Sequence, residues 1–223
     1  MVNYNHSLFY FCRSVKPDLN TVILPSAYLP PVEYFFYLIK AKRVYIEQFE
    51  TYPKQTYRNR CVIYSEKGGM PLIIPVTKPQ GNHSKTKDVQ IMNAENWQLN
   101  HWRAIESAYL ASPYFLFYRN ELEEFYTGEH KGLFQFNFKL LKVICQLTGI
   151  TPDLEFTSSF IKEPSGALDM RYRISPKKPP TLEYFPAYIQ VFSDRYGFIP
   201  NLSIIDLLFN KGPDTLDYLN SMI

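Results

Sequence analysis

Alternating apolar and polar stretches predict an α/β fold that opens with a βαβ-like unit. The apolar run at 21–24 ends at Pro25 and is typical of a buried strand. Two consecutive prolines then precede the aromatic stretch 33–39, and proline is tolerated in the first turn of a helix. A second short apolar run follows at 44–46. The first fifty residues therefore predict strand, helix, strand.

The rest of the chain predicts one hairpin and several helices. Apolar runs at 61–64 and 72–76 flank the sequence EKGG, and paired glycines between apolar runs indicate a hairpin. A half-exposed strand is expected at 89–91. The apolar spacing then predicts helices at 96–110, 131–148, 203–209 and 214–222. We therefore expect an α/β fold with a mixed sheet, a βαβ-like opening, a hairpin and a mostly helical C-terminal half.

The order of these elements leads us to expect a single α/β domain over residues 21–223. Residues 1–20 have no clear period, and we interpret them as an N-terminal extension that is disordered or lies outside the folded domain. Residues 161–186 contain five prolines and predict an irregular surface loop. Its local positive charge comes from Arg171, Arg173, Lys177 and Lys178.

Composition narrows the possible function classes. The chain has 223 residues, of which 46% are hydrophobic and 20% charged, so it can bury a sizeable core. The net charge of +3 is well below the dense positive charge of a duplex-binding protein, and no aromatic RNA-binding pattern is present. We therefore expect no nucleic-acid partner. The chain also lacks a glycine-rich phosphate-binding motif.

Cysteines, histidines and apolar runs exclude further classes. The three cysteines are scattered and form no CxxC pair, which fits a reducing compartment. The four histidines lie far apart in the sequence, so we expect neither a metal site nor a bound cofactor. No apolar run reaches membrane-spanning length, and the apolar patch near the N-terminus is too short for a signal peptide. We expect a soluble cytoplasmic protein without a membrane span.

Two positions next to predicted elements carry groups that could serve a ligand. Tyr28 follows the first strand, and ligands of open α/β sheets bind at the carboxyl ends of strands. The turn alone favours the alternative, a packed tyrosine. His101 lies on the predicted helix at 96–110 and is the side-chain type best suited to proton transfer at neutral pH. Its spacing alone favours a histidine at the edge of the core, and no catalytic pair is visible from spacing.

Two basic segments are candidates for anion binding. Arg58, Asn59 and Arg60 form a donor-rich cluster, and arginine binds carboxylates or phosphates with paired hydrogen bonds. The equally weighted alternative is a solvated loop whose arginines pair with nearby glutamates. The basic loop at 78–87 could cover an anionic substrate, although an ordinary surface loop is the commoner case.

Motifs along the chain occur in the same order in a known protein family. They are the run Leu24–Pro30 followed by Tyr34-Phe35, the pair Asn59-Arg60, the run Ile73–Val76, the segment Asp88–Ile91 followed by Trp97 and His101, and the closing run Tyr196–Asn210. On these motifs the chain resembles the WbqC-like proteins of bacterial O-antigen and other surface-polysaccharide gene clusters. The resemblance covers about residues 21–221. A Ser-Gly-rich segment that many members carry is missing at 158–190, so the chain resembles a short branch of the family.

The resemblance begins near Asn20, which bears on the natural start of the chain. Leu19 could be a non-AUG start codon read as leucine, so we expect residues 1–18 not to belong to the natural folded chain. Mass spectrometry of the native protein tests this expectation, and peptides containing Val2 or Asn3 would contradict it.

The resemblance implies a transferase that moves a small acyl or aminoacyl group, such as glycine, to a sugar. It implies His101 as the proton acceptor from the attacking hydroxyl or amine, with Glu47 as a second catalytic residue. It implies an anionic or nucleotide-linked substrate and these substrate-binding residues: Tyr28, Arg58, Asn59, Arg60, Lys85, Asp88, Trp97, Asn201 and Asp206. In such a site Arg60 would bind a phosphate or carboxylate, and the loop around Lys85 would close over it.

A different class of function fits the same resemblance. The chain could be a non-catalytic protein that binds either a ligand or another enzyme of the same pathway. An enzyme should bring Tyr28, Glu47, Arg60 and His101 together in one pocket. A binding protein would leave them dispersed and present an exposed aromatic surface instead.

Overall fold

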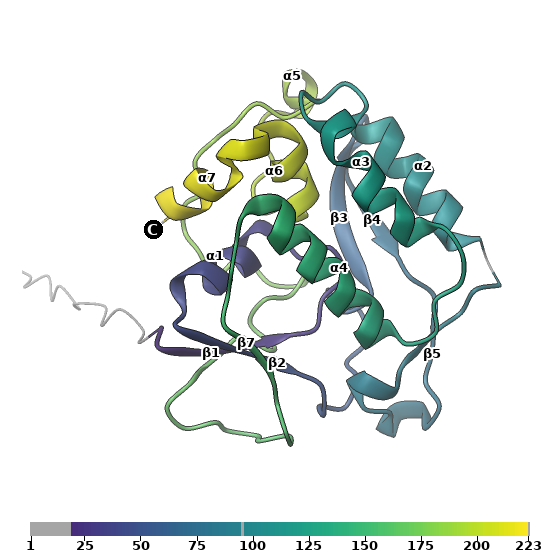
Figure 1. Cartoon of the computed structure of the whole chain (residues 1–223), viewed down its shortest axis with the longest axis vertical. Helices are drawn as coiled ribbons and strands as arrows, with labels where there is room; N and C mark the ends of the chain where they lie inside the picture. The colour runs from purple at the N-terminus through teal and green to yellow at the C-terminus, as the bar shows by residue number, and fades with distance from the viewer. Residues whose placement is uncertain (1–18, 95, 223) are drawn as a thin grey trace, which may run out of the picture.

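The computed structural model describes residues 19–94 and 96–222 (Figure 1). Residues 1–18 of the predicted N-terminal extension therefore lie outside the described residues. Its last two residues belong to the fold, because the carbonyl groups of Leu19 and Asn20 accept hydrogen bonds from the backbone of Lys42 and Arg43. These bonds attach the turn before β1 to the start of β2.

The predicted βαβ opening is confirmed. It consists of β1 (Thr21–Pro25), α1 (Val32–Lys40) and β2 (Arg43–Glu47), and the two strands are parallel with Val22 opposite Val44. Pro31 occupies the position before the first helical residue, where its missing N–H costs no hydrogen bond. Seven of the nine residues of α1 are buried, because the helix packs between the sheet and the last helices of the chain.

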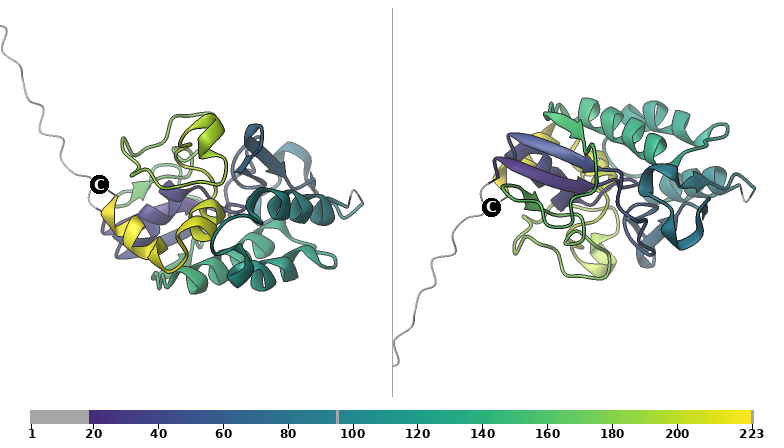
Figure 2. Two further views of the ribbon diagram at one scale, coloured as in Figure 1. Left: turned by 90° about the horizontal axis from the view of Figure 1, so that it is seen from above. Right: turned by 90° about the horizontal axis from the view of Figure 1, so that it is seen from below.

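Two short strands complete a four-stranded parallel sheet of order β7-β2-β1-β8. They are β7 (Leu154–Phe156), beside β2, and β8 (Leu168–Asp169), beside β1. The sequence predicted neither strand. Most of the predicted loop at 161–186 is irregular, but β8 attaches this segment to β1, one of the two inner strands. Figure 2 shows the sheet between α4 on one side and this irregular segment on the other.

The predicted hairpin is formed by β3 (Arg60–Ser65) and β4 (Gly68–Ile73), which pair in antiparallel register. Glu66 and Lys67 make the turn, and the two glycines are the first residues of β4. A third small sheet pairs β5 (Val76–Thr77) with β6 (Gln90–Ile91). The α/β fold class is therefore confirmed, with its parallel and antiparallel pairs in separate sheets.

All four predicted helices are present, and the structure adds α3 and the short α5, which the sequence did not predict. The apolar residues of α3 do not mark one buried face, since Leu116 and Phe117 are 64% and 73% exposed. The α-helices after the hairpin are α2 (Trp97–Tyr109), α3 (Phe115–Glu123), α4 (Leu133–Thr148), α5 (Ser193–Tyr196), α6 (Ile204–Lys211) and α7 (Thr215–Ser221). Short 3-10 turns are η1 (Gly81–His83), η2 (Thr86–Asp88), η3 (Glu124–Tyr126) and η4 (Gly212–Asp214).

Two glycines that follow helices differ in how closely other atoms pack around them, and this difference can be tested. Gly149 ends α4 with φ +72°, and a Cβ there would meet only Leu216 at 4.0 Å. Gly212 follows α6 with φ +54°, and a Cβ there would lie 2.5 Å from the Tyr114 ring. We expect Gly149→Ala to lower the free energy of unfolding by about 1 kcal/mol, and Gly212→Ala by about 1–3 kcal/mol more. Urea denaturation measures both, and equal losses would contradict the close contact at Gly212.

Candidate functional site

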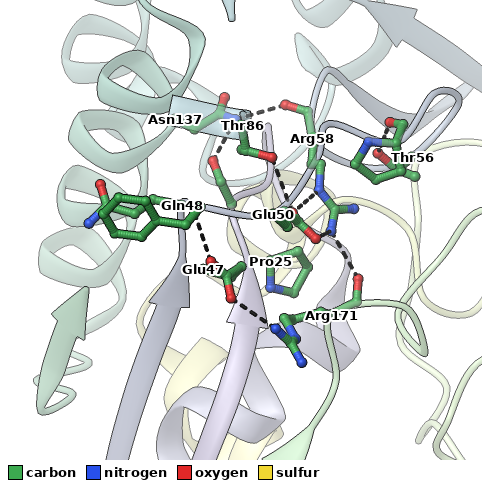
Figure 3. A network of polar contacts seen from close by, with 12 residues as sticks. Pro25, Glu47, Gln48, Glu50, Thr56, Arg58, Thr86, Asn137 and Arg171 are labelled. Carbon is green, nitrogen blue, oxygen red and sulfur yellow. Dashed lines mark hydrogen bonds and ion pairs between the residues drawn. The ribbon is translucent and has the colours of Figure 1, made fainter. Parts of the chain in front are cut away.

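Buried ion pairs close the carboxyl edge of the parallel sheet (Figure 3). Parallel strands end at the same edge, so Glu47 at the end of β2 and Asp169 at the end of β8 come close together. Arg171 joins them: its Nη1 donates to Glu47 Oε2 at 2.9 Å, and its Nη2 donates to Asp169 Oδ2 at 2.7 Å. The side chains of Glu47 and Arg171 are each 1% exposed.

A second ion pair extends this network toward α4. Arg58 donates to both carboxylate oxygens of Glu50, with 2.7 Å between Nη2 and Oε2. Arg58 Nη2 also donates to the backbone carbonyl of Arg171 at 3.1 Å. Asn137 of α4 donates to the carbonyl of Arg58 at 2.7 Å and to the Ser26 hydroxyl at 3.1 Å. Arg58 therefore pairs with a nearby glutamate, as in the alternative left open by the sequence, but the pair is buried and not in a solvated loop.

This network joins the carboxyl ends of the strands, and its arginines are not available to solvent. Both guanidinium groups donate to protein carboxylates and to backbone carbonyls. Breaking a buried pair by removing one partner leaves a desolvated charge, which is far more costly than losing a surface ion pair. The sequence could not identify Arg171 as the partner of Glu47, because 124 residues separate them.

A buried aromatic cluster holds three of the predicted site residues. The Tyr28 hydroxyl lies 3.0 Å from Nδ1 of His101 and 2.8 Å from the Tyr126 hydroxyl. Trp97 lies one turn before His101 on α2, and its ring meets the His101 ring edge-on at 5.2 Å. Tyr28 is 0% and His101 6% exposed. The structure therefore brings Tyr28, Trp97 and His101 together, inside the protein.

Burial determines the protonation states of the side chains in this cluster. Desolvation lowers the pKa of His101 to about 4, although a backbone contact to Ile73 acts in the opposite direction. Burial, and then the neighbouring Tyr126, raises the pKa of Tyr28 well above its usual value. At neutral pH the imidazole is therefore uncharged and both tyrosines keep their protons. An uncharged imidazole can accept a hydrogen bond at Nδ1 from the Tyr28 hydroxyl.

The other members of the Arg58 cluster belong to the hairpin. Asn59 donates to the carbonyl of Ile74 at 2.8 Å and orders the start of β3. Arg60 is partly exposed and lies opposite Ile73 in the hairpin. Within the described residues its buried Nε has no hydrogen-bond partner. Arg60 is thus the arginine of this cluster with a donor not engaged by the protein.

Asn201 and Asp206 hold the closing run in place. Asn201 and Glu33 exchange two hydrogen bonds, from the Asn201 amide to Oε1 at 2.8 Å and from the Glu33 backbone to Oδ1 at 2.9 Å. Asp206 accepts hydrogen bonds from Tyr188 at 2.7 Å and from Gln190 at 2.8 Å. Burial raises the pKa of Asp206 to about 6, with these donors acting against the shift. Both residues fasten α1 and α6 to neighbouring segments.

The predicted basic loop is anchored along the segment after β2. Backbone N–H groups of Thr86 and Lys87 donate to the carbonyls of Glu50 and Gln48, each at 3.0 Å. Lys85 forms an isolated bridge with Thr51. The loop ends in η2, which contains Asp88 and packs against α4. Lys85 and Asp88 therefore lie on a fixed segment beside the start of α4.

A cavity of about 380 Å³ lies between this segment and the start of α4. Its lining residues are Lys87, Gln90, His130, Lys131, Gly132, Gln135, Phe136 and Lys139. Apart from Lys87, which ends the predicted basic loop, none was singled out from the sequence as a site residue. One signal was available: Lys131, Gln135 and Lys139 recur every four residues along the predicted helix at 131–148, which places polar groups along one side of it.

Phe136 connects the cavity with the aromatic cluster. Its ring centroid lies 4.6 Å from that of His130, 5.7 Å from Trp97 and 6.1 Å from Tyr28. The two candidate catalytic residues are not brought together, because His101 belongs to the aromatic cluster and Glu47 to the ion-pair network. The cavity wall is thus supported from behind by the cluster that contains Tyr28 and His101.

Comparison with known proteins gives the family. Residues 26–178, more than half of the chain, match the WbqC-like protein family. The chain belongs to the WbqC-like protein family. The match spans Tyr28, the Arg58 cluster, His101, the cavity and Arg171, whereas the closing run with Asn201 and Asp206 lies beyond it.

A relative matches most of this WbqC-like chain. It is the uncharacterized protein Rv1507c of Mycobacterium tuberculosis (strain ATCC 25618 / H37Rv), 27% identical over 225 residues, which cover 88% of this chain and 96% of the relative. No solved structure matches the chain. Among the described residues, no helix is long and apolar enough to cross a membrane, and no group of histidine, cysteine or acidic residues is arranged to hold a metal.

Removing the arginine at the centre of the ion-pair network should strongly destabilise the protein. Arg171→Ala leaves Glu47 buried without its partner, so we expect the free energy of unfolding to fall by about 3–5 kcal/mol. Arg173→Ala is the control: Arg173 is exposed in the same segment, and its loss should cost no more than about 0.5 kcal/mol. Urea denaturation measures both variants. Similar losses for the two would contradict a network of buried ion pairs.

The buried, uncharged state of His101 predicts a pH dependence of stability. The folded-state pKa of about 4 lies below the ordinary value of 6.5, so the unfolded chain binds the proton more readily between these pH values. The contribution of His101 to the free energy of unfolding should therefore fall by about 1.5 kcal/mol from pH 6.5 to pH 5. Comparing the pH dependence of wild type, His101→Asn and the exposed-site control His83→Asn isolates this contribution. Loss of the same slope in both variants, or in neither, would contradict the assignment.

Proposed function

We propose that this WbqC-like protein transfers a small acyl or aminoacyl group to a sugar in surface-polysaccharide assembly and holds an anionic substrate in the cavity between η2 and α4. The observation that supports the proposal is the charge of the cavity. Lys87, Lys131 and Lys139 line it, and none of them forms an ion pair with a carboxylate among the described residues. Such a concentration of uncompensated positive charge attracts anions.

The shape and surroundings of the cavity fit this role. Its volume of about 380 Å³ is that of a small-molecule site. Lys87 comes from the loop that was expected to cover an anionic substrate, and its ammonium lies 4.4 Å from the centre of the Phe49 ring. The first turn of α4 also lines the cavity, and its helix dipole adds a weak attraction for negative charge.

For the residues expected from the family resemblance, we propose two kinds of role. Lys85, Asp88 and Arg60 lie at partly exposed positions and are proposed as contacts of the bound substrate. Tyr28, Trp97 and His101 are proposed as positioning residues, since they pack behind Phe136 in the cavity wall. Arg58, Asn59 and Glu47 are likewise proposed to position this edge of the sheet, and Asn201 and Asp206 to position α1 and α6.

A non-catalytic binding protein of the same pathway is the second candidate. One observation favours it: His101, the expected proton acceptor, is buried, and Nδ1 already contacts Tyr28. Binding in the basic cavity is common to both candidates, whereas turnover of a bound donor is expected only of the transferase.

A ligand screen with cavity variants tests the shared claim and then separates the two candidates. Nucleotide sugars, CoA thioesters, aminoacyl-adenylate analogues and free amino acids are tested by thermal shift on wild type, Lys131→Gln and Lys139→Gln. An anionic ligand at one hundred times its dissociation constant should stabilise the wild type by about 2.7 kcal/mol. Each cavity substitution should weaken its binding about tenfold, as expected for a lost hydrogen bond between charged groups.

Lys142→Gln is the matched control, because Lys142 is exposed on the same helix and does not line the cavity. Binding that falls equally in all three variants, or in none of them, would place the ligand elsewhere. Group transfer from a bound donor to a sugar supports the transferase, and tight binding without turnover supports the binding protein.

A further inference from the structure

His130 is held in a fixed position at the wall of the cavity. The Asn93 amide donates to its backbone carbonyl at 2.8 Å, and Asn93 Oδ1 accepts from its backbone N–H at 3.4 Å. Gln98 of α2 orients Asn93 by donating to the same Oδ1 at 3.0 Å. The ring of Phe136 packs against the imidazole, with 4.6 Å between the two ring centres. Such constraints are typical of side chains that must keep one orientation.

One ring nitrogen of His130 is already used by the protein. Nε2 lies 2.8 Å from the carbonyl oxygen of Phe125, and a carbonyl can only accept, so Nε2 carries a proton. The tautomer of the neutral ring is therefore fixed, with Nδ1 as the nitrogen that faces a ligand rather than the Phe125 carbonyl. Among the described residues, no protein group makes a hydrogen bond with Nδ1.

We propose that His130 is an anion-binding residue of this cavity and that the group it binds is a phosphoryl group, to which the imidazolium donates from Nδ1. This inference rests on the proposed function, because it names the substrate chemistry of the same cavity. The charged groups facing His130 are Lys87 of η2, Lys131 before α4 and Lys139 of α4. Three lysine ammonium groups beside the imidazole favour an anion at this point of the cavity.

The arrangement of donors favours a phosphoryl group over a carboxylate. Carboxylates are bound most specifically by the planar fork of an arginine, whereas lysine acts as a point charge and is a common phosphate ligand. Here the cations come from separate segments around the cavity. The two buried arginines nearby, Arg58 and Arg171, are already occupied by protein carboxylates. Several separate cations fit an anion with oxygens on more than one side.

Sulfate is the first probe, because it is a tetrahedral dianion whose charge does not change between pH 6 and pH 8. Its binding is followed by NMR titration of the whole chain at both pH values, with acetate as the carboxylate comparison. Wild type should bind sulfate about tenfold more tightly at pH 6 than at pH 8, and more tightly than acetate. Desolvation lowers the pKa of His101 to about 4, so this residue stays uncharged over the range.

His130→Asn and His130→Gln should bind sulfate with equal affinity at both pH values, and the two variants guard against a defect specific to one of them. His83→Asn is the matched control: His83 is exposed in the basic loop, and its loss should leave the tenfold difference intact. A wild-type affinity that does not depend on pH, or acetate binding as tight as sulfate binding, would overturn the proposal. A pH dependence that survives in both His130 variants would also overturn it.

Two further probes distinguish between the possible sources of the phosphoryl group. UDP-glucose represents a nucleotide-linked phosphoryl group, and farnesyl diphosphate represents a lipid-linked one. The probe that binds with the higher affinity identifies the source, provided that its binding depends on His130. Independence from His130 for both would contradict the inference. The proposed function fails in a different way, through loss of dependence on Lys131 and Lys139, so the two failures are distinguishable.

Discussion

The buried ion pair between Arg171 and Glu47 is the contact on which the arrangement of this protein depends. A lone charge cannot be taken out of water at acceptable cost, so the guanidinium must find acceptors for all its donors. It finds them on β2, at the end of β8 and in the irregular segment before β8. One side chain thereby holds together parts of the chain that are far apart in sequence. Arg58 repeats the arrangement with Glu50 and links it to α4 through Asn137.

Closure of the sheet edge has a consequence for where a ligand can bind. The carboxyl ends of parallel strands commonly form the ligand site of α/β proteins, but here buried arginines and carboxylates fill that position. The open, positively charged cavity lies beside it, at the start of α4. Two adjacent residues of α4 connect the regions: Asn137 bonds to the closed edge, and Phe136 separates the buried Tyr28 and His101 from His130. The sheet edge therefore supports the cavity wall through α4, but its own residues do not line the cavity.

Most of the fold could be predicted from local sequence, and most of the site could not. The β1-α1-β2 unit, the hairpin and the helices α2, α4, α6 and α7 each have an apolar pattern that local sequence reveals. Strands of two or three residues, such as β8, have no such period and exist because partners are available in the folded chain. Tyr28 and His101 contact each other in the aromatic cluster, whereas Glu47 pairs with an arginine 124 residues away. His130 was inaccessible to sequence reasoning, because its significance comes from Phe125, Asn93 and the lysines around it.

The most direct test of the central claim is to locate a bound tetrahedral anion by anomalous diffraction. Crystals of the protein soaked in tungstate, which resembles phosphate and scatters strongly, would show where the protein concentrates such an anion. The account predicts a peak inside the cavity, within hydrogen-bonding distance of His130 and of the lysines at 87, 131 and 139. A peak at the carboxyl edge of the sheet, on Arg58 or Arg171, with an empty cavity would contradict it. The ligand would then have displaced the ion pairs on which the present account depends.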